Sequence, residues 1–259
     1  MHKYLGSETI IGTVSLRAER RISPTKIPAS LRLVGTRIRC DESGLMKIIA
    51  ILLLAALPSS AEETAAKSEL IAPKSHLFNG KDLKGWTFFS AEGEAAAKTS
   101  WSAKDGVLAC TGKPTGYILT ETAYQNYTLT FDWRWTGGEG GNSGLLVHCS
   151  QQPEGKAWPK CIEAQLESGN AGDFWGIGET VEATGENKGA RWIRTADPKE
   201  KPIGEWNNMT VTCKGDTISV TVNGTLVNEG KNASTTKGAI GFQSEGSPIE
   251  FRNIVLIKK

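Results

Sequence analysis

The sequence predicts an all-β protein, with one sandwich of two antiparallel sheets over residues 77–259. Two observations lead to this prediction. From residue 77 to the end, short runs that alternate apolar with polar residues are separated by clusters of Gly, Asn, Asp and Pro. No long stretch repeats apolar residues at the spacing of a helix. Roughly 185 residues with turn signals at these intervals suit a single sandwich domain.

The strand and turn signals follow one another along this region. The run WSAKDGVLAC indicates a hairpin that turns at Asp105-Gly106. Residues 208–230 indicate a meander, in which Asn223-Gly224 is the dipeptide most typical of a two-residue hairpin turn. Residues 238–259 supply two closing strands, and only residues 120–126 suggest even a brief helical turn.

The run YTLTFDWRW, residues 127–135, shows the clearest alternation in the chain. Its aromatic and leucine side chains fall on one face of a strand, and Thr130, Asp132 and Arg134 fall on the other. The strand leads directly into a glycine-rich loop. We therefore place Arg134 among the candidate substrate-binding residues.

The segment MKIIAILLLAALPSSA, residues 46–61, has the pattern of a secretory signal peptide. A Lys follows Met46, an apolar run comes next, and small residues end the segment at Ala61. The run is shorter than the roughly 20 residues that a membrane span needs, so a permanent anchor is the less favoured alternative. We expect cleavage, no stable membrane span afterwards, and a secreted or periplasmic protein.

The remaining N-terminal residues carry no fold signal. Residues 1–45 precede the expected signal peptide, so translation is expected to begin at Met46; a disordered basic extension is the alternative. Residues 62–76 are rich in Glu, Ala and Lys and are expected to form a mobile linker. The domain itself is expected over residues 77–259.

Charge and cysteine content narrow the partners and the compartment. After Ala61 there are 21 Lys and Arg against 24 Asp and Glu, so the exported chain lacks a basic stripe for nucleic acid. Its four cysteines suit an oxidising compartment, and Cys149 and Cys161, which flank one loop, are the favoured disulfide. A zinc site is less favoured because there is no CxxC, and only His76 and His148 could join one.

Six motifs together resemble the 3-keto-disaccharide hydrolase domain family over about residues 75–259. They are LFNGKDLKGW (77–86), GGNSGLLVH (140–148), EAQLES (163–168), EWNNMTV (205–211), VNGTLVNEG (222–230) and GAIGFQSEGSPIEFRNIVL (238–256). The resemblance implies a concanavalin A-like jelly roll, in which one of two antiparallel sheets curves to form a concave face. It also implies an exported protein that acts on a carbohydrate.

The run CIEAQLES places three polar side chains on one face of a strand. Period-two alternation groups Glu163, Gln165 and Glu167, and sends the apolar residues between them to the core. The pattern is similar to the Glu-x-Asp-x-Glu strand of jelly-roll glucanases, but Gln165 replaces the central carboxylate. A neutral amide cannot tune a neighbouring carboxylate as a charge would, so the ordinary retaining mechanism is in doubt.

The stretch GGEGGNSGLLVHCS places a flexible glycine loop before a strand that contains a histidine. Alternation puts Gly144, Leu146 and His148 on one face of that strand. In the functional interpretation, Asn142 and Ser143 hydrogen-bond a sugar and His148 acts as acid or base. In the alternative, the segment is a tight turn and His148 is simply satisfied at the sheet surface.

Three further residues complete the candidate set. Gln243 and Glu245, in GFQSEGSP, are expected at the rim of the groove. Trp175 lies with Trp158 and Trp192 in a long irregular segment, and at least one of these rings is expected to stack on a sugar.

The resemblance implies cleavage of a 3-keto glycoside. A ketone at C3 acidifies the proton on C2, so a base can remove it and the glycosidic oxygen can leave from C1. Glu163 would be the base, His148 the acid, and Gln165 with Asn142 the donors to the developing enolate. A divalent cation that polarises the ketone would replace some of these donors. A non-catalytic, lectin-like binding module and an ordinary β-glucanase are the alternatives.

Overall fold

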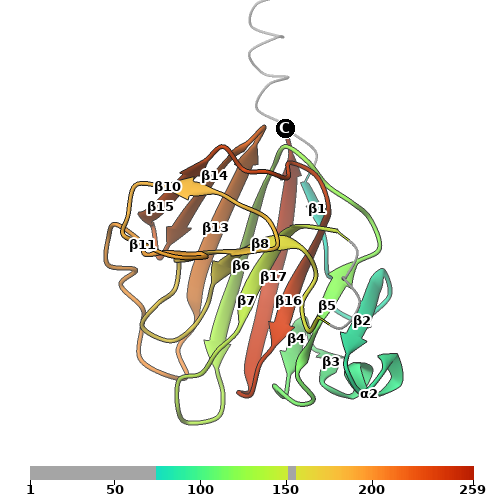
Figure 1. Cartoon of the computed structure of the whole chain (residues 1–259). Helices are drawn as coiled ribbons and strands as arrows, with labels where there is room; N and C mark the ends of the chain where they lie inside the picture. The colour runs from blue at the N-terminus through green and yellow to red at the C-terminus, as the bar shows by residue number, and fades with distance from the viewer. Residues whose placement is uncertain (1–73, 151–155) are drawn as a thin grey trace, which may run out of the picture. The chain divides into compact units, whose positions relative to one another are not determined.

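The computed structural model describes residues 74–150 and 156–259, which form a sandwich of two antiparallel sheets (Figure 1). This architecture confirms the predicted all-β, concanavalin A-like jelly roll. The expected extension (1–45), signal peptide (46–61) and most of the expected linker (62–76) lie outside the described residues. Within the described residues, no helix is long and apolar enough to cross a membrane.

One sheet has nine strands, and its long central strands β13, β6 and β17 pair side by side. In spatial order the strands are β10 (Glu182–Ala183), β15 (Thr225–Lys231), β14 (Thr217–Val222), β13 (Asn207–Lys214), β6 (Tyr127–Trp135), β17 (Ile249–Lys258), β4 (Val107–Cys110) and β3 (Trp101–Lys104), with β1 (Lys74–His76) also paired to β17.

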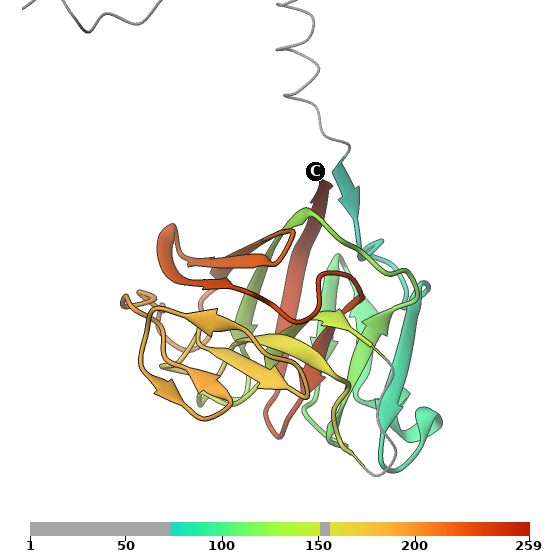
Figure 2. The ribbon, with the colours of Figure 1, turned by 45° about the horizontal axis from the view of Figure 1, so that its top comes forward.

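The other sheet has eight strands and carries most of the candidate site residues. Figure 2 shows its strands β8, β9, β11 and β12, in yellow and orange, as a layer in front of the long strands of the nine-stranded sheet. In spatial order the strands are β11 (Asn187–Lys188), β12 (Arg191–Trp192), β9 (Phe174–Ile177), β8 (Cys161–Gln165), β7 (Gly144–Cys149), β16 (Ala239–Ser244), β5 (Gly116–Thr120) and β2 (Trp86–Ser90).

The core lies between the two sheets and is filled by one side of each alternating strand. On β6 the burial alternates residue by residue, and the aromatic face predicted for residues 127–135 is the buried one. On β8 the apolar residues Ile162, Ala164 and then Leu166 enter the same core. Full burial of a large apolar side chain stabilises a fold by about 1.5–3 kcal/mol, so these residues determine which face of each strand is turned inward.

The predicted turns have the backbone conformations that their residues favour. Asp105 and Gly106 have φ angles of 51° and 80° between β3 and β4, and Asn223 and Gly224 have φ angles of 47° and 82° between β14 and β15. Two consecutive residues in the left-handed region match the twist of the flanking strands. Both hairpin predictions are confirmed.

Two local predictions were wrong. The one helix in the described residues is α2 (Glu94–Thr99), not residues 120–126. Its sequence EAAAKT is rich in Ala, with Glu94 in the first turn and Lys98 in the last, which suits the helix dipole. In addition, residues 74–76 of the expected linker form β1, whose three residues pair with residues 255–257 of β17.

A β-bulge at His148 changes the alternation along β7. On the neighbouring strand β16, Ala239 pairs with Cys149 and Gly241 pairs with Leu146. These two residues are two positions apart on β16, but their partners are three positions apart on β7. The extra residue is His148, which has a φ angle of 55°. A bulge inserts one unpaired residue and exchanges the faces of the residues that follow. Cys149 therefore shares the outer face of the sheet with Leu146, and His148 does not.

The four described cysteines, Cys110, Cys149, Cys161 and Cys213, are buried free thiols. The favoured Cys149–Cys161 disulfide is therefore absent, although the bulge brings these two cysteines together. Val147 pairs with Ile162, and beyond the bulge the Ser150 amide donates to the Lys160 carbonyl at 2.9 Å, so Cys149 comes opposite Cys161. A hydrogen bond with the Cys149 thiol and burial raise the pKa of Cys161.

We predict that Gly238→Ala destabilises the protein by about 1–3 kcal/mol, because overpacking beside a fixed backbone forces the chain to shift. A methyl group on Gly238 would overlap the backbone of His148 and Cys149 at the bulge. Urea denaturation monitored by tryptophan fluorescence measures the change. Thr236→Ala, at an exposed position of the same loop, serves as the control. Equal unfolding midpoints for the two variants would contradict the close approach at the bulge.

Candidate active site

Glu163 and Gln165 project from the outer face of the eight-stranded sheet, which is the face turned away from the core. Their neighbours Ile162, Ala164 and Leu166 lie in the core, so the predicted division of β8 into a polar and an apolar face is confirmed. Glu163 and Gln165 are nevertheless only 4% exposed each. The outer face is therefore covered around them, and both polar groups are held largely out of water.

The carboxyl group of Glu163 lies over Gly144 of β7, beside the amide of Gln243. A methyl group on Gly144 would overlap Glu163 Oε1 and would also approach Gln243 Oε1, so only glycine leaves room for this arrangement. Both oxygens are buried and lack a hydrogen-bond partner among the described residues. Two acceptors placed together in this way are suited to a shared proton or to donors from a ligand.

Burial raises the pKa of Glu163 from 4.5 to about 8, and the negative charge of Glu245 adds to the rise. A hydrogen bond with Gln243 and the positive charge of Arg191 oppose this change but do not cancel it. A carboxyl group whose pKa lies near neutral pH can exchange protons efficiently in both directions. Such a group in a covered site is typical of general acid–base catalysis.

The amide of Gln165 has a fixed orientation. Its Oε1 accepts the backbone N–H groups of Leu166 and Glu167 at 2.8 Å and 2.9 Å. Because both donors are backbone N–H groups, the end of the amide that meets them must be the oxygen. Nε2 is therefore the end that does not contact these backbone groups. In the described part of the chain no hydrogen bond uses Nε2. Gln165 therefore offers two N–H donors beside Glu163, as expected of a substrate-binding residue.

Two more carboxyl groups face Glu163. Glu245 pairs through its backbone with Asn142. Burial, with the charge of Glu167, raises the pKa of Glu245, while a hydrogen bond from Asn142 lowers it. Glu167 accepts a hydrogen bond from Asn170 Nδ2 at 2.8 Å. The structure thus brings together Glu163, Gln165, Glu167, Asn142, Gln243 and Glu245 of the predicted set.

His148 does not join this group. Because of the bulge, its ring turns to the core side, where it contacts the edge of Tyr127 of the opposite sheet at 5.9 Å between centroids. Its Nδ1 lies 3.1 Å from the Thr235 carbonyl oxygen, and burial lowers the pKa of the imidazole. The expectation that His148 lies on the face of Gly144 was wrong. A fully buried ring on the other side of the sheet cannot protonate a substrate near Glu163.

Ser143 and Arg134 are also placed elsewhere. The Ser143 hydroxyl is buried and donates to the Gln243 carbonyl at 2.9 Å, so it ties the glycine loop to β16 rather than facing a ligand. Arg134 lies on the outer face of the nine-stranded sheet. There it binds Glu250 through two nitrogens at 2.8 Å and covers the ring of Trp206. A substrate-binding role at the Glu163 site is therefore excluded for Arg134.

Trp175 lies next to Glu163 and connects it to a charged network. It is opposite Glu163 on β9 and opposite Arg191 on β12, and the Arg191 guanidinium lies 5.6 Å from its ring centroid. Its buried Nε1 has no partner among the described residues. Trp175 therefore stays a candidate for contact with a sugar, as predicted.

The centre of the charged network is Asp173, whose side chain is fully buried. Its two oxygens accept from Arg191 Nε at 2.8 Å, from the Arg194 backbone N–H at 2.9 Å and from Arg194 Nη1 at 3.1 Å. Arg194 also donates to Asn170 and to the Gly169 carbonyl. The network thus joins the turn that follows β8 to the segment that contains β12.

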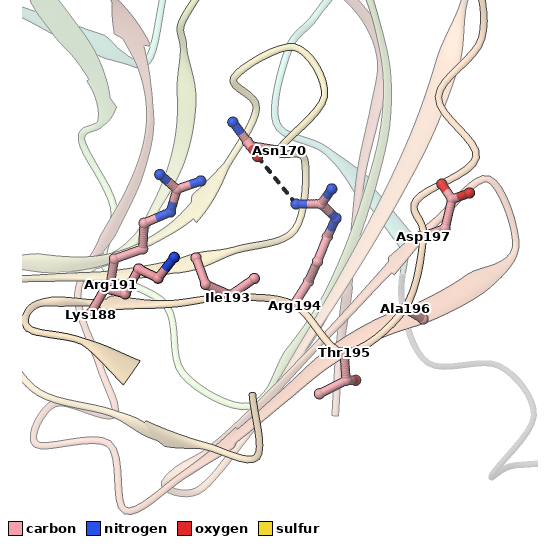
Figure 3. A pocket seen from close by; sticks show the side chains of 8 residues that line it. All are labelled: Asn170, Lys188, Arg191, Ile193, Arg194, Thr195, Ala196 and Asp197. Atoms are coloured by element: carbon pink, nitrogen blue, oxygen red, sulfur yellow. Dashed lines mark hydrogen bonds between the residues drawn. The ribbon is translucent and has the colours of Figure 1, made fainter. Parts of the chain in front are cut away.

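Arg191 and Arg194 extend toward the turn that carries Asn170, as Figure 3 shows. They border a cavity of about 490 Å³ next to Trp175. Its lining residues are Asn170, Lys188, Arg191, Ile193, Arg194, Thr195, Ala196 and Asp197. Asp173 offsets one of the two arginine charges and Glu167 lies 3.8 Å from Arg191, so the cavity presents guanidinium donors that are held in fixed orientations.

Sequence reasoning missed Gly144, Asp173 and Arg191 as contributors to the site. The sequence placed Gly144 only on one strand face with Leu146 and His148, but its role depends on a carboxyl group from the neighbouring strand. Asp173 and Arg191 lie 18 residues apart in irregular sequence, and no periodic pattern links them. The identification of that long segment as functional was the one signal that pointed toward them.

The described residues contain no group of three or more His, Cys, Asp or Glu side chains arranged to hold a metal ion. The Oδ1 of Asn142, which lacks a hydrogen-bond partner among the described residues, is the type of oxygen that a divalent cation binds.

Comparison with known proteins connects this geometry to carbohydrates. A family model described as a 3-keto-α-glucoside-1,2-lyase-like domain matches residues 73–257. Among proteins with curated descriptions, none matches the chain.

Solved structures share the fold. Two, provisionally described as glycosyl hydrolases of Parabacteroides distasonis, are 24% and 25% identical with TM-scores of 0.56 and 0.53. They cover 76% and 72% of this chain, which spans 97% and 100% of theirs. A structure reported with endo-acting O-glycanases of the human gut microbiota is 12% identical, with a TM-score of 0.50, and covers 72% of this chain and 98% of its own. The domain is therefore a glycosyl hydrolase-like or carbohydrate-binding jelly roll.

We predict that Glu163→Gln removes a loss of stability that the native protein shows between pH 4.5 and pH 8. In this window the unfolded chain releases the Glu163 proton and the folded chain keeps it, so the free energy of unfolding falls as pH rises. A pKa raised from 4.5 to about 8 corresponds to a loss on the order of 5 kcal/mol, at about 1.4 kcal/mol per pH unit.

Urea denaturation at pH 5 and pH 8.5 tests this expectation. The difference between Glu163→Gln and the native protein should be larger at the higher pH and should favour the variant there. Glu229→Gln, at an exposed carboxyl group on β15, is the matched control. A parallel pH dependence for the native protein and Glu163→Gln would show that the folded chain does not retain this proton.

We also predict that Asp173→Asn lowers the free energy of unfolding by about 3 kcal/mol, because it leaves two arginines without their buried partner. Asp197→Asn is the matched control, since Asp197 lies near Arg194 but forms an exposed pair with Lys199. Thermal unfolding should separate the two variants clearly. Similar melting temperatures would mean that the Asp173 network contributes little to stability.

Proposed function

Because the chain belongs to the 3-keto-α-glucoside-1,2-lyase-like family, whose model covers residues 73–257, we propose that it cleaves 3-keto glycosides by elimination. The observation that carries this proposal is the buried carboxyl group of Glu163. It lies on the outer face of the sheet with a pKa near 8, among amide groups that have hydrogen-bonding capacity to spare. We place the reaction on this face.

The reaction needs a base, an acid and a donor to the developing enolate. The ketone at C3 acidifies the C2 proton, which the base removes; the C2–H electron pair first forms the enolate. The pair then closes a double bond between C1 and C2 as the C1–O bond breaks. The departing oxygen takes a proton from the acid, and water afterwards adds to the enone. No net oxidation occurs, and the products are the 3-keto sugar and the free alcohol.

Glu163 is the base in this proposal. A carboxylate held in a covered site is a stronger base than one in water, because burial penalises its charged form. Its position over Gly144 leaves Oε1 without a protein partner, so this oxygen can approach a substrate proton. After it accepts the proton, the neutral carboxyl group is the form that the site favours below about pH 8.

Gln165 provides the donor to the enolate. Because two backbone N–H groups fix its carbonyl end, its Nε2 needs no reorganisation when charge develops on the substrate. A donor that is already oriented stabilises the transition state more than one that must first rotate into place.

Glu245 replaces His148 as the proposed acid. It is partly exposed and contacts Asn142, and burial next to Glu167 raises its pKa, which favours the protonated form. It also interacts with Glu163, so a substrate at Glu163 lies within its reach. Two carboxyl groups near each other seldom both ionise, so one base and one acid can coexist here.

We further propose that the protein acts outside the cytoplasm, secreted or in the periplasm, after removal of residues 46–61. The motivation is the signal-like sequence of that segment. Its substrates would then be sugars oxidised outside the cell or in the periplasm.

We predict that the purified protein releases a 3-keto monosaccharide from 3-keto-trehalose or 3-keto-cellobiose and leaves the unoxidised disaccharides intact. The value of kcat/KM should follow a bell-shaped pH profile, because the reaction needs Glu163 ionised as base and Glu245 protonated as acid. Glu163→Gln should lower kcat by at least about 100-fold, the usual contribution of a general base. Product chromatography measures each rate.

Glu250→Gln is the control variant, because this partly buried carboxyl group pairs with Arg134 on the far sheet. It should retain native kcat and KM. Cleavage of unoxidised β-glucan would instead favour the β-glucanase alternative. Binding of sugars without turnover of any substrate would favour the lectin-like alternative.

A further inference from the structure

Three aromatic side chains form an apolar surface on the same face as Glu163. Phe89 of β2 stacks on Tyr117 of β5, with centroids 5.1 Å apart and planes inclined by 2°. Trp158 also packs against Tyr117, with ring centroids 6.2 Å apart. We call Phe89, Tyr117 and Trp158 the aromatic shelf. The shelf lies outside the main core, because Tyr117 belongs to a separate cluster on the outer face of the sheet.

The outermost ring of the shelf is open to solvent. Phe89 is 42% exposed and is one of three large hydrophobic residues in the described part of the chain that are exposed, with Ile203 and Leu226. Its ring is already ordered by stacking on Tyr117, so a ligand that covers it loses little side-chain entropy. An ordered, exposed aromatic ring is the surface on which the apolar face of a sugar or an aryl ring packs.

The shelf is next to the proposed catalytic groups. Tyr117 pairs in register with Gln243, whose amide approaches Glu163 over Gly144. Tyr117 also packs in one cluster with Leu146, which pairs with Glu163. Tyr117 is only 1% exposed, so the open ring of the shelf is Phe89 on β2. From β8 to β2 is four strand spacings, or about 19 Å between strand axes, and long side chains shorten the gap. A ring that is bonded to the reacting sugar as its leaving group therefore fits between Glu163 and the shelf.

The order of the strands determines which part of the substrate reaches the shelf. In the sheet, β8 is followed by β7, β16, β5 and β2. The proposed base, Glu163, is on β8, and the proposed acid, Glu245, directly follows β16. The departing oxygen must lie near the acid, which is on the shelf side of the base. The group bonded to that oxygen then continues toward Phe89, the exposed ring of the shelf.

We propose that the aromatic shelf is the binding subsite for the leaving group, and that this group is a ring with an apolar face. The inference rests on the proposed function, because it uses the order of base and acid. A second sugar and an aryl aglycone both offer such a face. A short alkyl leaving group does not, so it should gain nothing from the shelf.

We predict that Phe89→Ala raises KM by roughly three- to tenfold for substrates with a ring as leaving group, the effect of losing one aromatic contact. The substrates are 3-keto-cellobiose, the 3-keto derivative of phenyl glucoside, and that of methyl glucoside. The methyl compound should show no change in KM, and kcat should stay constant for all three. Phe89→Tyr should restore the native values. Of 3-keto-cellobiose and the phenyl compound, the substrate whose KM rises more carries the ring that the shelf prefers.

Leu226→Ala is the matched control, because Leu226 is an apolar residue of similar exposure, 49% against 42% for Phe89, on β15 of the other sheet. It should change none of these values. An equal rise in KM for methyl and ring-bearing substrates, or no rise for any of them, would overturn the assignment of the shelf. Melting temperatures establish that Phe89→Ala remains folded.

The role of the shelf can be tested even if the proposed reaction does not occur. If the native protein cleaves none of the 3-keto substrates, calorimetric titration with cellobiose, phenyl glucoside and methyl glucoside tests the shelf directly. Binding of the first two that is weakened in Phe89→Ala, but not in Leu226→Ala, supports the shelf without the reaction. Equal affinity of the native protein and Phe89→Ala for each ligand overturns it.

Discussion

The position of Glu163 depends on the burial of its neighbours on β8. Ile162, Ala164 and Leu166 fill the space between the sheets, and a strand exposes alternate residues on opposite faces. A slip of one residue would place a carboxyl group in the core and expose these apolar side chains, at a cost of several kcal/mol. The hydrophobic core therefore fixes the direction of the Glu163 carboxyl group, which is the proposed base.

The covered environment that tunes Glu163 also weakens the fold. A carboxyl group that is 4% exposed, and that faces the charge of Glu245, costs free energy when it ionises. The same burial gives it the basicity that the proposed elimination requires. Gly144 makes the arrangement possible, because any side chain there would push the carboxyl group out of place. Stability and the proposed activity thus make opposite demands on one residue.

Two different kinds of surface border Glu163 along the sheet. On the β9 and β12 side, Trp175 and the Asp173 network supply polar groups held in fixed positions. On the β5 and β2 side, Phe89 supplies an apolar surface and stacks on the buried ring of Tyr117. This asymmetry gives the face a direction, so that a polar, oxidised sugar and its leaving group encounter different chemistry. The proposed reaction requires such a direction, because the base acts on the proton of C2 and the acid acts on the oxygen bonded to C1.

The sequence by itself determined the all-β sandwich, its hairpin turns and the polar face of β8, because alternation and turn residues act locally. It also identified Gln165, Gln243 and Glu245 as candidates. Tertiary structure decided what became of His148, since one extra residue at a bulge turned its ring into the core. Arg134 belonged to the other sheet, and Ser143 was occupied by a backbone carbonyl. Alternation specifies the two faces of a strand, but only pairing between distant strands decides which residues meet there.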